Sequence, residues 1–413
     1  MKRIFSSFMV FLFCGCMLFS EESVMNQETT EQKNYISAPA YPNQADSLLE
    51  NMDSLTLMNY MGRGINLGNT LEATNNWRNF NLADASKYET AWGQPVTTKE
   101  VFIAYKKAGF DSVRIPVAWT NTMDWRNGDF EINKNYLERV ATIVKYALDA
   151  DLYVIINDHW DNGWWGLFGS DRKKALQIFD SIWDAVGTYF KDFSYKLIFE
   201  AGNEEWGDRF NDTVDGVHGR LNVGSQYKTI TFLGQRFVDK IRAQGGNNTK
   251  RFLLIPGYST DITRTTMASY VMPVDNTNPD VQKLLISVHY YTPSTYCILS
   301  EDANWGKVAT TWGTEAEKQS LDKDFAKMTK FTSQGYGVIV GEYGVAQIKD
   351  ERGRWVKKDG MEDWLSCVVQ ACDKYKYASF LWDCNTFFKK KKDADGNCVG
   401  FEDPAIAEVY KRK

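Results

Sequence analysis

Histidine, paired cysteines and basic patches are scarce in this sequence. Its 413 residues include 3 histidines and 7 cysteines, and no two cysteines have CxxC spacing. Zinc sites and disulfide scaffolds usually show such pairs, so the sequence indicates neither. The net charge is −5 and no basic stripe occurs, which argues against a nucleic-acid partner. We predict no metal and no cofactor, and mostly buried thiols. One disulfide, Cys384 to Cys398, stays open.

The N-terminus has the layout of a secretion signal. Lys2 and Arg3 precede the apolar run 4–13, and charged residues resume at Glu21. The run is too short to span a membrane comfortably, so we predict a signal peptide over residues 1–20. Cys16 ends a Phe-Cys-Gly-Cys segment that resembles a bacterial lipoprotein box, in which this cysteine becomes the lipidated N-terminus. Plain secretion and anchoring to the bacterial cell envelope therefore both remain open.

Polar composition separates this signal from the rest of the chain. Residues 21–52 are rich in Gln, Asn, Thr and Glu and show little periodicity, which predicts a linker. From Asp53 short apolar runs alternate with amphipathic helices. A capping-box pattern at Thr97–Glu100 begins one helix, Gly109 ends it, and a strand-like run follows. We therefore predict one folded domain over residues 53–413.

Eight strand-like runs occur in this domain, most of them preceded by a helix. Such alternation predicts an α/β fold that closes as a (β/α)8 TIM barrel. The runs are Gly64–Leu67, Phe110–Pro116, Leu152–Ile156, Tyr195–Phe199, Arg251–Ile255, Lys283–Val288, Tyr336–Val340 and Ala378–Trp382.

Polar and aromatic residues gather where these runs end. In a parallel barrel the C-terminal ends of the strands form one rim, which carries the chemistry. Two glutamates there, Glu204 and Glu342, suggest an acid/base pair. Taken singly, each rim residue could be structural: an ion-pair partner, a satisfied histidine or core filling. Their shared position favours a site. The residues are Asn66, Asn69, Arg114, His159, Asn203, Glu204, His289, Tyr291, Glu342 and Trp382.

These rim motifs resemble glycoside hydrolase family 5, the cellulase family of clan A. The resemblance rests on Asn203-Glu204 after a strand, Glu342 in Ile-Val-Gly-Glu-Tyr-Gly, Arg114 in Val-Arg-Ile-Pro-Val, His159, and His289-x-Tyr291. The segments Gly64–Glu72 and Ala91–Lys99 are similar to the branch that holds bacterial endoglucanases and xyloglucanases. The likeness runs from about Asp53 to the C-terminus.

The resemblance implies a retaining endo-β-1,4-glucanase without a cofactor. Glu204 would be the general acid/base and Glu342 the nucleophile, with carboxyl groups about 5 to 5.5 Å apart. Arg114 and Tyr291 would keep Glu342 ionised, and Asn203 would contact the sugar 2-hydroxyl. The remaining implied roles are orientation and sugar contact for His159 and His289, and ring stacking for Trp382.

The sequence departs from the family pattern at two places. Glu205 and Trp206 follow the acid glutamate, where the family usually has proline, and His159-Trp160 replaces a frequent His-His pair. Glu205 could compete as the acid. The register with Asn203 favours Glu204, and we expect Glu205 to be a surface acid on the following loop.

Tryptophan is abundant, with 14 residues, and several follow strands. Sugar rings stack on aromatic planes, whereas aromatic side chains also dominate cores, so we expect about half of the loop tryptophans to be core. The loop 292–314 should form one wall of a cleft. The predicted substrate-binding residues are Asn66, Asn69, Trp165, Trp206, Trp305 and Trp382.

Several functions stay open at this point. The main expectation is a monomer that hydrolyses β-1,4-glucan polysaccharides or oligosaccharides. A xyloglucanase is the nearest alternative, and mixed-linkage glucan, mannan and xylan are further substrates to consider. A non-catalytic glycan-binding barrel and a metal-dependent hydrolase on the same fold are the alternatives from other classes.

Overall fold

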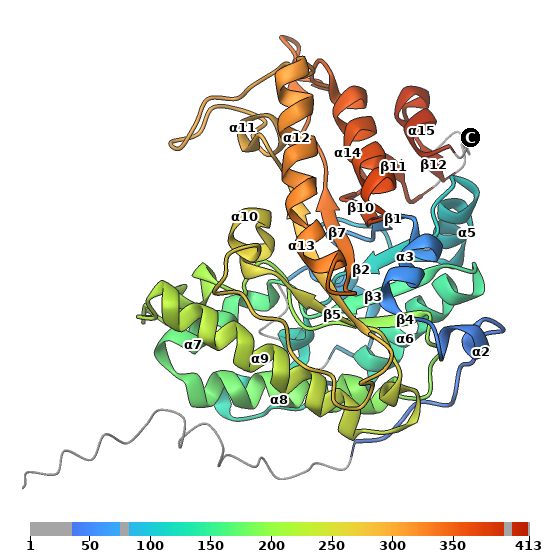
Figure 1. Cartoon of the computed structure of the whole chain (residues 1–413), viewed down its shortest axis with the longest axis vertical. Helices are drawn as coiled ribbons and strands as arrows, with labels where there is room; N and C mark the ends of the chain where they lie inside the picture. Colours follow the sequence, from blue (N-terminus) through green and yellow to red (C-terminus); the bar gives the residue numbers. More distant parts are fainter. Residues whose placement is uncertain (1–34, 75–81, 392–398, 412–413) are drawn as a thin grey trace, which may run out of the picture. The chain divides into compact units, whose positions relative to one another are not determined.

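A closed barrel of eight parallel strands forms the centre of the molecule (Figure 1). The computed structural model describes residues 35–74, 82–391 and 399–411. The strands neighbour one another in the order β1, β10, β7, β6, β5, β4, β3, β2, and β2 closes on β1. The predicted fold and all eight predicted strands are confirmed. The strands are β1 (Arg63–Asn66), β2 (Ser112–Ile115), β3 (Tyr153–Asn157), β4 (Leu197–Glu200), β5 (Leu253–Pro256), β6 (Leu284–Tyr290), β7 (Gly337–Tyr343) and β10 (Ala378–Leu381).

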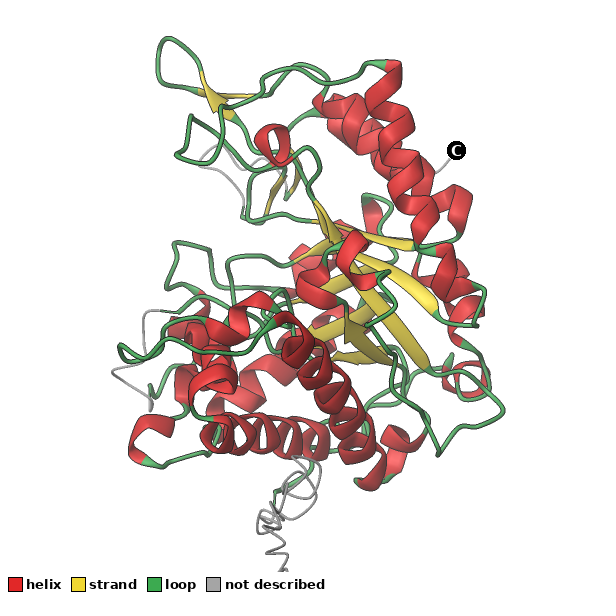
Figure 2. Cartoon of the chain, turned by 60° about the vertical axis from the view of Figure 1, so that its left-hand side comes forward, coloured by secondary structure: helices red, strands yellow, loops and turns green. Residues whose placement is uncertain are grey.

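Helices surround this barrel, and small strand pairs lie outside it (Figure 2). The small pairs are β8 (Ile348–Lys349) with β9 (Trp355–Val356), and β11 (Phe388–Lys389) with β12 (Gly400–Phe401). The helix predicted from residue 97 begins at Lys99, but the Thr98 side chain makes no capping hydrogen bond. The helices are α2 (Asp46–Leu49), α3 (Ser54–Met61), α4 (Ser86–Glu89), α5 (Lys99–Lys107), α6 (Lys134–Asp149), α7 (Leu167–Ser170), α8 (Arg172–Tyr189), α9 (Val223–Ala243), α10 (Ile262–Thr265), α11 (Ser294–Cys297), α12 (Glu315–Lys327), α13 (Thr329–Thr332), α14 (Met361–Tyr375) and α15 (Pro404–Tyr410).

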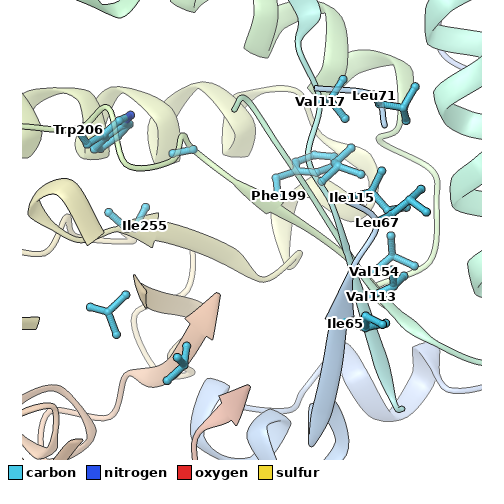
Figure 3. Packing of buried hydrophobic residues seen from close by; sticks show 14 of the residues in the cluster. Ile65, Leu67, Leu71, Val113, Ile115, Val117, Val154, Phe199, Trp206 and Ile255 are labelled. Atoms are coloured by element: carbon cyan, nitrogen blue, oxygen red, sulfur yellow. The ribbon is translucent and has the colours of Figure 1, made fainter. Parts of the chain in front are cut away.

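Two hydrophobic cores follow from the alternation of side chains along each strand. Val154 on β3 belongs to the larger core, which packs the strands against the helices (Figure 3). Its neighbour Ile155 belongs to a second core inside the barrel, together with Ile198 and Ile339. Met61 of α3 joins this inner core. The inner core is thus apolar, whereas the positions nearer the C-terminal ends of the strands are polar.

The predicted linker boundary at residue 52 is wrong. The compact unit begins at Tyr35, because residues 35–52 pack against the barrel. Ala38 donates its amide to the carbonyl of Tyr189, and Leu49 is fully buried in the inner core. The polar composition of this segment concealed a few apolar residues that decide its packing. The predicted signal peptide lies outside the described residues.

The four described cysteines carry free thiols, and Cys297 and Cys372 are buried as predicted. Cys384 is among them, and Cys398 lies outside the described residues. Within the described ranges, no helix has the length and apolar character needed to cross a bilayer.

Candidate active site

A one-residue irregularity in β7 turns Glu342 toward the barrel interior. Ile339 faces the inner core, while Val338 and Val340 face the helices. Strict alternation would therefore turn Glu342 outward. The pairing with β6 shifts instead, because Val288 pairs with Val340 and the next pair is His289 with Glu342. The extra residue resets the alternation, as a β-bulge does.

Glycine is required at the extra position, residue 341. A Cβ added there would lie 2.9 Å from the Ser287 hydroxyl oxygen and 3.1 Å from Nε2 of His289. Such contacts are shorter than normal packing allows. Gly341 therefore lets β6 carry a serine and a histidine directly beside the residue that precedes Glu342.

Arg114 joins the two halves of the rim from the end of β2. It is fully buried and donates from Nη1 to Glu342 at 2.8 Å and from Nη2 to the Asn203 side-chain oxygen at 2.8 Å. Its Nε donates to Glu200 at 2.7 Å. The rigid guanidinium fork thus fixes the nucleophile candidate and the residue before Glu204 in one geometry.

Glu204 and Glu342 face each other across His289. Nδ1 of His289 lies 2.9 Å from a Glu204 oxygen and 3.5 Å from a Glu342 oxygen. The reactive atoms of the three side chains all lie within 4.8 Å of one another. A nearby nucleophile and acid at about 5 Å suit a direct attack on a sugar between them.

The two carboxyls open into a cavity of about 900 Å³. His159, Asn203, Tyr291 and Trp382 line it, together with Glu204 and Glu342. The Tyr291 hydroxyl donates to Glu342 at 3.0 Å. The rings of His159 and Trp382 lie parallel within 9°, with centroids 5.9 Å apart. A cavity of this size, with apolar planes and converging polar groups, suits a small chain of sugars.

Burial and neighbouring positive charge change the pKa values of the two carboxyls in opposite directions. Burial raises the pKa of Glu342, although the charges of His289 and Arg114 oppose this increase. Burial also acts to raise the pKa of Glu204, but the hydrogen bond and charge of His289 outweigh it, so this pKa lies below its ordinary value. Burial and then the charge of Arg114 hold the pKa of His159 well below its ordinary range.

The hydrogen bond and the charge that oppose burial and lower the pKa of Glu204 come mainly from His289. Nε2 of that ring is buried and has no hydrogen-bond partner among the described residues. The Glu204 side chain is 38% exposed, and a bound sugar would remove that water. Loss of this water disfavours the charged carboxylate and so favours the protonated acid.

Two predicted substrate contacts are wrong. Trp165 and Trp206 are fully buried and pack in the larger core, where Figure 3 shows Trp206. Neither ring offers a face to a sugar. An aromatic residue after a strand can turn toward the helices as readily as toward the rim, and these two turn toward the helices.

The other predicted substrate contacts are not core residues, but they differ in how they relate to the cavity. Asn66 is fully buried, donates to the Gly341 and Leu381 carbonyls and accepts from Arg114, so it supports the rim and does not reach the cavity. Asn69 is half-buried, and its backbone amide donates a hydrogen bond to the Glu72 carboxylate. Trp305 is exposed but is not among the residues that line the cavity. Sugar contacts of Asn69 and Trp305 remain predictions.

Glu205 is not the surface acid that we expected. It is 2% exposed, and one carboxyl oxygen has no partner among the described residues. Burial, followed by the charge of Glu204, raises its pKa to about 8. It therefore stays protonated at neutral pH, behind the rim, and does not line the cavity.

Sequence reasoning missed several residues of this site. Glu200 pairs with Arg114, and Ser287 packs beside Gly341. Strand alternation could have found both, since each lies two residues from a rim or core position on its strand. Ile298 and Trp355 also line the cavity. Ile298 lies in the loop expected to form a wall, but Trp355 lies 13 residues after Glu342, where no strand-end pattern points.

Comparison with known proteins identifies the family. The model of the family described as Cellulase (glycosyl hydrolase family 5) matches residues 70–387. This chain belongs to glycosyl hydrolase family 5. It is 34% identical over 345 residues to Endoglucanase A of Paenibacillus barcinonensis, covering 78% of this chain and 80% of that protein. It is 30% identical over 364 residues to a xyloglucan-specific endo-β-1,4-glucanase of Bacteroides ovatus, covering 85% and 70%.

A solved structure of the family is similar as well. It is a complex of cellotetraose with a mutant of the family 5 lichenase from Caldicellulosiruptor sp. F32. The TM-score is 0.72 at 29% identity, over 93% of this chain and 99% of the other. The chain is a cellulase-like glycoside hydrolase, as the motifs predicted.

Proposed function

We propose that this glycoside hydrolase is a retaining endo-β-1,4-glucanase, with Glu342 as nucleophile and Glu204 as general acid/base. The observation that carries the proposal is the close approach of the two carboxyls, within 4.8 Å, around His289. An inverting enzyme would need a wider gap that leaves room for a water molecule.

In the first step Glu342 attacks the anomeric carbon while Glu204 gives its proton to the departing glycosidic oxygen. One C–O bond breaks, and a glycosyl ester on Glu342 forms. In the second step Glu204 takes a proton from water, whose oxygen displaces Glu342 and restores the original configuration. Arg114 and Tyr291 hold the Glu342 carboxylate, and Asn203, whose side-chain oxygen accepts from Arg114, contacts the sugar 2-hydroxyl from the wall of the cavity.

The substrate assignment follows the relatives and the cavity. The printed names of the similar proteins include an endoglucanase, a xyloglucan-specific endo-β-1,4-glucanase and a lichenase. We assign an unbranched β-1,4-glucan as the main substrate, with Trp382 under one glucosyl ring. Xyloglucan is the second candidate, because the 30% identity to its hydrolase extends over 85% of this chain.

New reducing ends should be measured on carboxymethylcellulose, xyloglucan, mixed-linkage glucan, mannan and xylan, with Glu342→Ala alongside. Activity on the glucans that disappears in Glu342→Ala supports the proposal. No activity of the unaltered protein on any of the five would favour the non-catalytic glycan-binding alternative.

A metal-dependent hydrolase makes a different prediction. Glu204, His289 and Glu342 are also a group that could hold a cation. Two-carboxylate chemistry needs no ion, so we expect full activity after dialysis against chelator, whereas a metal enzyme would lose activity and regain it with added Zn²⁺.

We further propose that the chain is exported and acts as a monomer. The basic and apolar N-terminus supports export, and Cys16 is the candidate lipid attachment site. The mass of the mature N-terminus decides between anchoring and plain secretion. Light scattering of the purified protein tests the monomer.

A further inference from the structure

We infer that Trp355 is a sugar-binding platform of the outer cleft, which stacks on a glucosyl ring distant from the cleaved bond. This inference rests on the proposed action on β-1,4-glucan chains. Trp355 lines the same cavity as Glu204, Glu342 and Trp382. It would extend the chain of sugars beyond the ring that Trp382 holds.

The exposure of the cavity residues places Trp355 at its outer end. Glu342 and His159 are less than 10% exposed, whereas Trp355 is 55% exposed and Ile298, on the same cavity, is 51% exposed. An indole that lines a cavity and stays half exposed leaves apolar surface in water, which costs free energy unless a partner covers it. The apolar face of a pyranose ring fits such a plane.

The hairpin that carries Trp355 is built to hold the ring in place. Strands β8 and β9 pair Lys349 with Trp355, and the Lys349 ammonium lies 5.1 Å from the centre of the indole. The turn between them is closed by Asp350, whose carboxylate accepts from Arg354 at 2.8 Å. A platform that is ordered before the sugar arrives loses less entropy on binding.

Both ends of the hairpin are fastened to neighbouring parts of the chain. Before it, Ala346 donates its amide to the Cys297 carbonyl at 2.8 Å. After it, the buried Lys358 donates to the Leu299 carbonyl at 2.6 Å. These contacts fasten the hairpin to the loop that follows β6 and carries Ile298. Two loops thus form one wall of the outer cleft, with an exposed apolar side chain on each.

The test is a comparison of cello-oligosaccharides of increasing length. For the unaltered enzyme, kcat/KM should increase at the length that first reaches Trp355. Trp355→Ala should remove this increase, about 2- to 10-fold as expected for one stacked ring, and leave the shortest hydrolysed oligosaccharide unchanged. Trp355→Phe should retain part of it. Tyr60→Ala removes a 44% exposed aromatic ring at a distance from this cavity and should change nothing.

An undiminished increase in Trp355→Ala would overturn the inference. An equal loss at every length would also overturn it, because the ring would then act at the reaction centre. Calorimetric binding of cellohexaose and cellotriose to Glu342→Ala, with and without Trp355→Ala, gives a readout that does not depend on hydrolysis. Weaker binding of the hexamer alone supports the platform, even if the unaltered protein proved inactive and the proposed hydrolysis failed.

Discussion

Glu205→Gln should stabilise the protein in a pH-dependent way. Burial and the charge of Glu204 raise the Glu205 pKa from 4.5 to about 8. Between these two values the folded protein holds a proton that the unfolded chain has released. Stability therefore falls as pH rises through this window, by about 1.4 kcal/mol per pH unit, and is level above pH 8. From pH 5 to pH 7.5 the loss is about 3 kcal/mol.

Glutamine has nearly the shape of the protonated acid and does not titrate. The gain in unfolding free energy of Glu205→Gln over the unaltered protein should therefore grow by about 3 kcal/mol between pH 5 and pH 7.5. Urea denaturation at both pH values measures this difference, and any constant effect of the amide cancels. Glu351→Gln, at an exposed position, is the matched control and should show no such growth.

A difference that stays constant with pH would refute the reasoning, because Glu205 would then be ionised in the folded state. Activity gives a second readout. Glu205→Gln should retain activity within about two-fold, whereas Glu204→Gln should abolish it, since only Glu204 lines the cavity. The opposite result would make Glu205 the acid and reverse our assignment.

Three further changes probe the rim. Gly341→Ala should lower kcat at least 10-fold while the barrel still folds, because its Cβ meets Ser287 and His289; unchanged kcat would contradict the bulge argument. Tyr291→Phe removes a hydrogen bond to a charged carboxylate, worth about 1.5–3 kcal/mol, so kcat should fall about 10- to 100-fold at similar thermal stability. Arg114→Met should lower the free energy of unfolding by about 3–5 kcal/mol and abolish activity, because it leaves buried carboxylates unpaired; wild-type stability in urea would argue against its joining role.

The strands of this barrel could be predicted because each is a short apolar run with a polar or aromatic residue after it. The same rule predicted which glutamates reach the rim. It could not predict the direction of Trp165 and Trp206, since a loop side chain has no fixed period. Glu205 was misplaced for a related reason. Its polarity indicated solvent, but its neighbours bury it next to Glu204.

Contacts between segments that are far apart in the chain could not be predicted from the sequence. The segment 35–52 is polar in composition, yet Leu49 and Met52 bury themselves in the inner core. Trp355 lies on a hairpin whose position depends on Lys358 and on backbone contacts to another loop. No local pattern shows such contacts, because they join segments separated by many tens of residues.

The single extra residue at Gly341 decides on which side of the barrel wall the Glu342 carboxylate lies. Glu342 lies three residues after the inward-facing Ile339, and it faces inward as well only because the pairing with β6 passes over Gly341. A regular strand of the same length, without the bulge, would leave eight strands and a closed barrel, but the carboxylate would point into the layer of apolar side chains under the helices. The irregularity at Gly341 is thus needed for catalysis and not for closure of the barrel.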